Sequence, residues 1–340
     1  RTQGPQRAMN PAWHPDGQKI AYFQSTVKDG AVTFLALNQL DLSTGKHTRL
    51  VNKLSLAQPA DVPGELKLNF GNVEDLVRMT CSASWSPDGK RLAYSGPSGE
   101  ASGIWVAEAN GAGAVPLLPE GRSGFDPVWS PDGSHLVYLG FAMEEPEPGA
   151  APQTRSPDLE VVRPDGSGRR VLWNARERGP LAALGPSPRW SADGKSVLVL
   201  VDGEKKADFG IPDTCALWSI PVDGGEPRQV APIPGPSPFA TLTPHATAMT
   251  FFFAPRTPDE SVPTLGVAAA PFAEPKSLHR LDRKLVGIAE GEDVDRFPIP
   301  DISPDGKHVA VAIIPKKSPA TLLLAGTGGE QLERIPIPRP

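Results

Sequence analysis

One ten-residue motif recurs along the chain, and this repetition constrains the fold more than any other feature. WSPDGKRLAY begins at Trp85, and the close copies are WHPDGQKIAY at Trp13, WSPDGSHLVY at Trp129, WSADGKSVLV at Trp190 and ISPDGKHVAV at Ile302. A motif that returns every few tens of residues is typical of repeat architectures. Inside the motif, Pro presets φ and Gly supplies the left-handed conformation that closes a hairpin. Each copy therefore predicts a strand ending at the aromatic residue, a tight turn and a second strand.

A second hairpin follows each copy of the motif. In the third repeat, for example, Leu159–Val162 and Arg170–Leu172 flank a turn that contains Gly166 and Gly168. Four antiparallel strands per repeat are the makeup of a propeller blade. A degraded copy, Leu242–Phe251, fills the wide gap before Ile302. The sequence thus predicts an all-β, six-bladed β-propeller in one domain, with a long insertion at 52–80 and blades at about 8–51, 81–119, 125–174, 187–232, 239–282 and 298–337.

Composition agrees with many short strands and narrows the possible partners. The chain has 40 Pro and 34 Gly, which disfavour long helices and favour turns. Its net charge of -5 gives no electrostatic footprint for nucleic acid. No apolar run is long enough to span a bilayer, so we expect no membrane insertion. Two cysteines, Cys81 and Cys215, are too few for a disulfide framework or a four-ligand zinc site, and we interpret them as separate, half-buried thiols.

The five clear copies of the motif resemble the TolB-like, WD40-like (PD40) β-propeller repeat family. The resemblance covers nearly the whole chain, but the first repeat already opens at Asn10–Trp13, so we expect no counterpart of the α/β domain that precedes the propeller in TolB. The resemblance implies a periplasmic or extracytoplasmic protein of the bacterial envelope. We interpret the start at Arg1 as a signal peptide already removed. The resemblance to this family also implies that the channel mouth of the propeller is a docking place for a partner segment.

The longer connections are expected on one face of the propeller. Turns between strands one and two, and three and four, are short in every repeat, and added length falls in the other connections. Binding residues concentrate in such loops on rigid scaffolds. Residues 71–79 could form a short helix, and the acidic residues of 144–147 and 290–295 suit either a cation or basic partner, or plain solvated loops. The expected long connections are Gln24–Thr33, Gly140–Pro157, Asp202–Asp213, Ala254–Ser261, Asn52–Thr80, Ala175–Ser187 and Asp282–Pro298.

Polar residues just before the motif are candidates for the channel mouth. The innermost strand of each blade ends at the aromatic residue, so positions one and three before it should lie near the axis. Four polar side chains at these positions are our candidate binding contacts: Asn10, Asp126, Arg189 and Asp301. A water-filled polar tunnel without any ligand would explain the same residues.

The sequence contains no recognisable catalytic motif. G-x-S-x-G, H-E-x-x-H, C-x-x-C and P-loop patterns are absent. The six histidines occupy different positions in their repeats, so we do not expect them to form a cluster. One Asp per turn supplies too few ligands for a calcium ion. We therefore expect a monomeric, non-catalytic protein–protein interaction scaffold that binds a protein or peptide, with no cofactor and no metal. The alternatives are a hydrolase or lyase that uses Asp126 and Asp301, with or without a divalent cation, and a sensor or gating domain of a larger protein.

Overall fold

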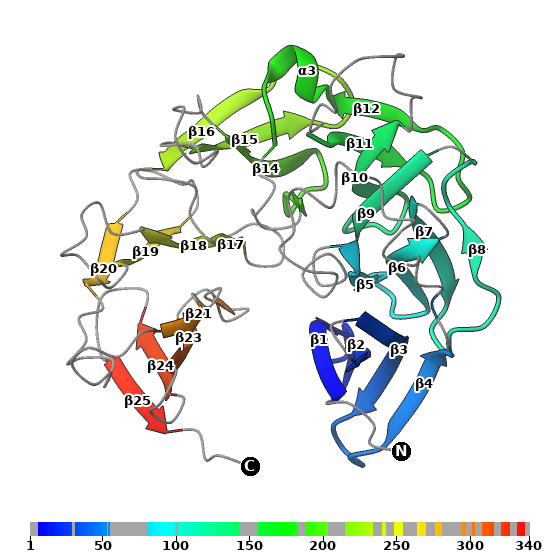
Figure 1. Cartoon of the computed structure of the whole chain (residues 1–340). Helices are drawn as coiled ribbons and strands as arrows, with labels where there is room; N and C mark the ends of the chain where they lie inside the picture. The colour runs from blue at the N-terminus through cyan, green and yellow to red at the C-terminus, as the bar shows by residue number, and fades with distance from the viewer. Residues whose placement is uncertain are drawn as a thin grey trace. The chain divides into compact units, whose positions relative to one another are not determined.

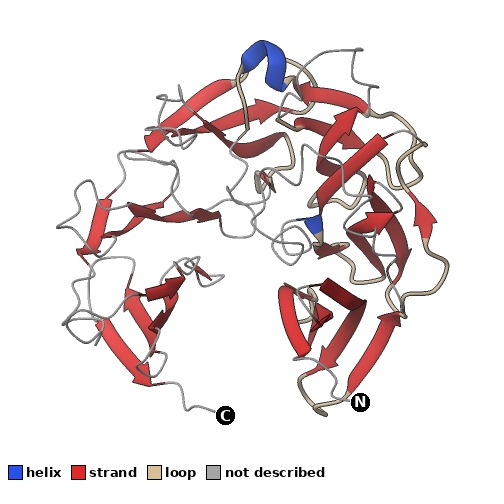
Figure 2. Ribbon diagram, in the orientation of Figure 1, coloured by secondary structure: helices blue, strands red, loops and turns tan. Residues whose placement is uncertain are grey.

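The structure is a computed structural model of the chain, and strands make up nearly all of the regular structure that it describes (Figures 1 and 2). The chain divides into two compact units, Arg1–Ala175 and Arg176–Pro340, and each is described by itself. The described residues are 6–28, 31–52, 54, 80–98, 101–120, 122–142, 156–181, 188–202, 215–233 and, beyond these, the strands at 240–242, 248–253, 264–269, 276–280, 294–296, 301–302, 308–315, 321–326 and 332–336.

The first unit contains three four-stranded antiparallel sheets, and in each the strands follow one another in chain order. The first sheet consists of β1 (Gln6–Trp13), β2 (Lys19–Lys28), β3 (Ala31–Asp41) and β4 (His47–Val51). The second consists of β5 (Ala83–Trp85), β6 (Arg91–Ser98), β7 (Ala101–Glu108) and β8 (Val115–Pro116). The third consists of β9 (Arg122–Trp129), β10 (Leu136–Ala142), β11 (Asp158–Val162) and β12 (Arg170–Trp173), and the short helix α3 (Ala175–Arg178) follows it.

The second unit continues the same antiparallel pattern. Its first sheet consists of β13 (Arg189–Trp190), β14 (Ser196–Asp202), β15 (Cys215–Pro221) and β16 (Arg228–Ile233). The next consists of β17 (Ala240–Leu242), β18 (Ala248–Phe253), β19 (Thr264–Ala269) and β20 (Lys276–Arg280). In the last, β21 (Val294–Arg296) and β22 (Asp301–Ile302) both pair with β23 (His308–Pro315), and β24 (Thr321–Gly326) and β25 (Leu332–Pro336) follow.

The predicted all-β class and the four-stranded antiparallel repeat are confirmed. The degraded motif at Leu242–Phe251 lies in β17 and β18, the first two strands of a complete sheet. The arrangement of six blades around one axis, and the blade boundaries within one domain, stay predictions. The expected helix at 71–79 lies outside the described residues.

One expected loop is wrong. Residues 24–28 and 31–33 are strand rather than connection, because Gln24 pairs with Ala36 and Lys28 pairs with Ala31. Gln24–Thr33 was predicted as a connection between two strands, but residues 24–28 and 31–33 extend the hairpin of β2 and β3 instead. Only residues 29 and 30 lie between these strands.

The motif forms its turn through a fixed set of hydrogen bonds. In the second sheet, the Ser86 hydroxyl donates to Asp88 at 2.7 Å, and Asp88 accepts the Lys90 amide at 3.1 Å. Gly89 has φ +70°, the left-handed conformation that Gly adopts without strain. The same Ser–Asp bond forms at Ser130–Asp132 and Ser191–Asp193, both at 2.6 Å. The predicted tight turn is therefore confirmed in the second, third and fourth sheets.

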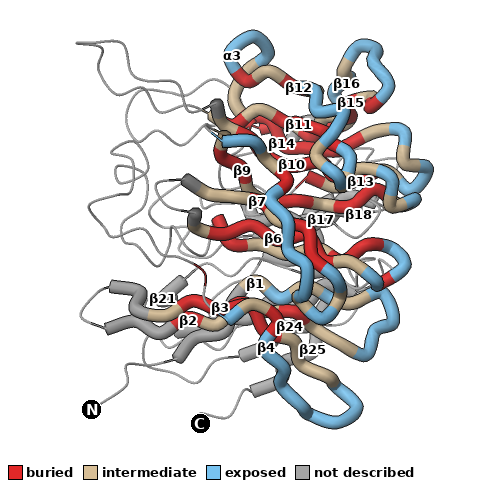
Figure 3. The backbone as a smooth tube through the Cα atoms, turned by 90° about the vertical axis from the view of Figure 1, so that its right-hand side faces the viewer, coloured by how far each residue is buried: buried red, intermediate tan, exposed pale blue. Residues whose placement is uncertain are grey.

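Apolar side chains pack between neighbouring sheets of the first unit. Phe23 and Leu37 of the first sheet are fully buried against Leu92 and Tyr94 of the second. Ile104 of the second sheet and Leu117, which directly follows β8, pack in the same way against Leu136 and Tyr138 of the third sheet. Figure 3 shows buried residues in the middle of the strands and exposed residues at the turns. Burial of each such large side chain contributes roughly 1.5–3 kcal/mol.

Candidate binding surface

Each sheet has two different ends. The chain makes its turns between strands one and two, and three and four, at one end, which we call the turn end. The connections between strands two and three, and from one sheet to the next, leave from the other, the long-connection end. Residues 53–79, 143–155, 182–187 and 203–214 all belong to connections of the second kind. Of the two acidic groups at 144–147 and 290–295, only Asp295 lies among the described residues, in β21.

The four predicted channel residues all lie in strands that precede the motif's turn. Asn10 is in β1 and Asp126 in β9, both in the first unit. Arg189 is in β13 and Asp301 in β22, both in the second unit. Their meeting at one channel mouth stays a prediction, as does the pairing of Asp126 with Asp301 that the hydrolase or lyase hypothesis needs.

Asn10 and Asp126 have a backbone role that the sequence analysis missed. Both have left-handed backbone, with φ 50° and 55°, and each lies at a shift in strand register. Asn and Asp tolerate this conformation better than other residues with a Cβ. Each stands directly before a proline, in Asn10–Pro11 and Asp126–Pro127. The repeated x-Pro-x-Trp pattern could have signalled this bulge. The left-handed backbone at the bulge explains why Asn and Asp occupy these two positions, without any need for a ligand.

Hydrogen bonds join the first strands of neighbouring sheets in the first unit. The indole of Trp85 donates from Nε1 to the carbonyl oxygen of Ala12 at 3.2 Å, and Trp129 donates to that of Ser84 at 3.1 Å. In both cases the acceptor residue directly precedes the aromatic residue of the preceding sheet. Asn10 adds a contact from its side-chain amide to the carbonyl of Cys81. These bonds hold β1, β5 and β9 side by side.

The aspartates of the motif accept hydrogen bonds from residues of their own turns. Hydrogen bonds from Ser130 and Ser134 lower the pKa of Asp132 to about 2. The pKa values of Asp88 and Asp193 are lowered by the hydroxyls of Ser86 and Ser191 in the same way. Their carboxylates are thus committed to turn structure. Among the described residues, no group of three or more His, Cys, Asp or Glu side chains could hold a metal ion.

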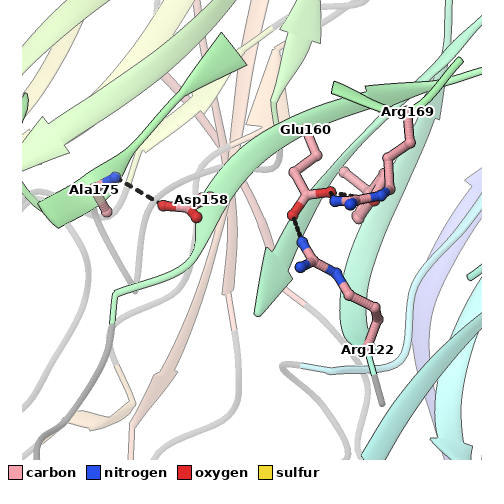
Figure 4. Close-up of polar contacts among 6 residues, drawn as sticks. Arg122, Asp158, Glu160, Arg169 and Ala175 are labelled. Carbon is pink, nitrogen blue, oxygen red and sulfur yellow. Dashed lines mark hydrogen bonds and ion pairs between the residues drawn. The ribbon is translucent and has the colours of Figure 1, made fainter. Parts of the chain in front are cut away.

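A buried ionic cluster in the third sheet is the main polar feature that the sequence analysis missed. Glu160 of β11 is fully buried, and its carboxylate accepts from the Tyr138 hydroxyl at 2.5 Å. The same carboxylate forms ion pairs with Arg169, at 2.7 Å, and with Arg122 (Figure 4). A Cβ atom added at Gly140 would lie 2.8 Å from Glu160 Oε1, so a glycine there leaves room for the carboxylate. Burial and the bond to Glu160 raise the pKa of Tyr138.

Both cysteines are free thiols, as interpreted from the sequence, but they are buried rather than half-buried. Burial raises the pKa of Cys81 to about 12. A neutral, enclosed thiol is a poor nucleophile and a poor metal ligand. Across the described residues, no helix is long and apolar enough to cross a membrane.

Comparison with solved structures identifies the fold. No protein-family model matches the chain, and no curated protein matches it. TolB from Acinetobacter baumannii superimposes with a TM-score of 0.55 at 15% identity, over 94% of this chain and 64% of that chain. The β-propeller domain of the Trilobed protease from Pyrococcus furiosus gives a TM-score of 0.58 at 13% identity, over 100% of this chain and 85% of that chain. The chain has a TolB-like β-propeller fold.

The propeller also resembles part of several peptidases. A puromycin-hydrolyzing peptidase of Mycobacterium tuberculosis gives a TM-score of 0.62 at 14% identity, over 98% of this chain and 47% of that chain. The chain spans 64% of the TolB structure and 48% of an acylaminoacyl peptidase from Pyrococcus horikoshii. At such low identities the likeness concerns the fold alone, because propellers host unrelated functions.

Proposed function

We propose that this propeller is a non-catalytic protein- or peptide-binding module of the bacterial envelope, and that its partner binds at the long-connection end. The observation that supports this is the difference between the two ends of the sheets. Tight Ser–Asp–Gly turns close the turn end, whereas the connections 53–79, 143–155 and 203–214 leave from the other. Extended connections on a rigid sheet scaffold are where binding residues concentrate.

The extracytoplasmic location is supported by the TolB-like fold, and the state of the cysteines is compatible with it. Cys81 is 0% and Cys215 is 4% exposed, so an oxidising compartment would not readily convert them to disulfides. Release of the protein by osmotic shock from cells that express the natural gene would support the location. Retention with a cytoplasmic marker protein would contradict it.

Two shortened variants test the binding surface. Asp202 pairs directly with Cys215, so an Asn-Gly turn can replace residues 203–214 without disturbing the hairpin. Gly140 pairs with Asp158, and continuing this register puts Ala142 opposite Ser156, so Asn-Gly can replace residues 143–155 as well. The matched control keeps both connections and inserts Gly-Ser-Gly-Ser between Asp165 and Gly166, at the turn end.

The assay is selection of a phage-displayed random peptide library on the full chain, followed by measurement of individual peptides by fluorescence anisotropy. We expect the peptides to lose affinity for the shortened variants and to keep it for the turn-end control, with unchanged melting temperatures. Equal affinity for the shortened chains would reject the placement of the partner. Light scattering of the same samples checks the expected monomer.

A further inference from the structure

The cluster around Glu160 contains one more positive than negative charge. The guanidinium groups of Arg122 and Arg169 both pair with the single Glu160 carboxylate. Arginine stays charged at any pH at which proteins fold. Tyr138 adds no negative charge, because burial and Glu160 raise the pKa of its hydroxyl. One cation of the cluster, in which the side chains of Arg122 and Arg169 are 21% and 33% exposed, therefore lacks its own counter-ion within the cluster.

Arg122 is the member of the cluster that reaches the long-connection end. It is the first residue of β9 and pairs with Ala142, the last residue of β10. Its side chain is 21% exposed, whereas Glu160 is 0% exposed. Nη2 faces the carboxylate, as Figure 4 shows, and Glu160 is the one side-chain acceptor that it has in the described part of the chain. A guanidinium has five donors, so one edge remains for a second acceptor.

The surroundings hold Arg122 in place before any ligand arrives. Ser102 and Ser123 close the seam between the second and third sheets beside it: the Ser102 amide donates to the Ser123 hydroxyl at 2.9 Å, and that hydroxyl donates back to the Ser102 carbonyl at 3.1 Å. The buried Glu160 fixes one edge of the guanidinium. A side chain that is already ordered loses little entropy on binding.

We propose that Arg122 recognises a carboxylate of the partner, so that the ligand class of this propeller is a peptide that offers a side-chain or C-terminal carboxylate. The inference rests on the proposed function, because it names the chemistry of the partner that the long-connection end would bind. A carboxylate matches the planar fork of a guanidinium through two parallel hydrogen bonds and would balance the excess charge of the cluster.

The test uses fluorescence anisotropy with labelled nonapeptides and the full chain. One pair carries three internal Glu or three internal Gln residues with blocked ends, and a second pair of neutral peptides has a free or an amidated C-terminus. The two pairs distinguish a side-chain carboxylate from a terminal one. We expect a peptide with a carboxylate to bind wild type, and Arg122→Gln to weaken it about tenfold or more, since a hydrogen bond to a charged group is lost. Arg170→Gln, at an exposed position of β12 outside the cluster, is the matched control and should bind like wild type.

Arg122→Gln should fold, because Glu160 keeps Arg169 and Tyr138 as partners. If its melting temperature falls sharply, Arg122→Lys serves instead, since it keeps the charge and loses the planar fork. The proposal is overturned if neither carboxylate peptide binds wild type better than its neutral partner. It is also overturned if Arg122→Gln and Arg122→Lys both bind as wild type does. Failure of the proposed function is measured in a different experiment: the shortened variants would bind the library peptides as tightly as wild type does.

Discussion

Replacing Glu160 with Gln should destabilise the first unit strongly. Gln has the shape of Glu but no charge, and its amide nitrogen is a donor where the structure needs acceptors for Arg122, Arg169 and Tyr138. The guanidinium groups of two partly exposed arginines, 21% and 33% exposed, would then remain without their buried carboxylate. Removing one partner from a buried ion pair typically costs about 3–5 kcal/mol.

The effect is large enough to measure by thermal unfolding. Each kcal/mol shifts the melting temperature by roughly 2–4 °C in domains of 150–250 residues, so Glu160→Gln should lower it by about 6–20 °C. The matched control is Glu108→Gln, which makes the same change at an exposed position of β7. It should lie within about 0.5 kcal/mol of wild type.

A third variant separates the lost charge from lost packing. Arg122→Met, Glu160→Leu and Arg169→Met together remove all three charges and keep much of the volume. Buried ionic clusters replaced in this way are often as stable as the original. We expect the triple variant to melt well above Glu160→Gln. A Glu160→Gln protein as stable as the Glu108→Gln control would refute the view that the carboxylate compensates the two arginines.

Three further predictions concern the turns, the bulge and the cysteines. Asn10→Ala should cost roughly 1–2 kcal/mol more in urea unfolding than Asn10→Gly, because both variants lose the bond to Cys81 and only Ala is strained at φ 50°, so equal losses would contradict this. The pKa of Asp132 is lowered to about 2 in the folded state, so its contribution to stability is present above pH 4 and is lost as the pH falls toward 2. Asp132→Asn should therefore lose less melting temperature than wild type between pH 5 and pH 2, and parallel curves would count against it. Cys81 and Cys215 should react with a thiol reagent only after unfolding, and rapid labelling of the native protein would contradict their burial.

The repeated motif made the sheets predictable, because the same residues must build the same turn each time. Ser, Asp and Gly of the motif form identical hydrogen bonds in the second, third and fourth sheets. Even the degraded copy at Leu242–Phe251 could be assigned, since the spacing of the other copies required a sheet there. Gln24–Thr33 was misassigned because hairpin strands of one repeat can be longer than in another, and no periodic signal marks where they end.

The ionic cluster could not be predicted from periodicity, because in the described part of the chain it occurs in a single repeat. Glu160 lies opposite Tyr138, and the positions opposite Tyr94 and Tyr22 hold Trp105 and Asn38. A charged residue inside the apolar run Leu159–Val162 was the available signal. Its partners come from the start of β9 and from the turn before β12, so the contact depends on the folded sheet rather than on spacing in the sequence.

The candidate channel residues show where residue type alone misleads. Asn10 and Asp126 were chosen because they are polar near an expected axis. The structure explains both by a left-handed backbone before a proline, a requirement that Asn and Asp meet better than most residues. Arg189 and Asp301 remain untested as contacts.

The indole bonds between sheets point backward along the chain, and this has a consequence for biosynthesis. Trp85 donates to Ala12 and Trp129 donates to Ser84, so each acceptor leaves the ribosome before its donor. Chains generally fold from the N-terminus as they are made. A nascent chain that ends just after Trp85 already contains the donor and the acceptor of the first of these bonds. Each new sheet can therefore dock on the sheet made before it while synthesis continues.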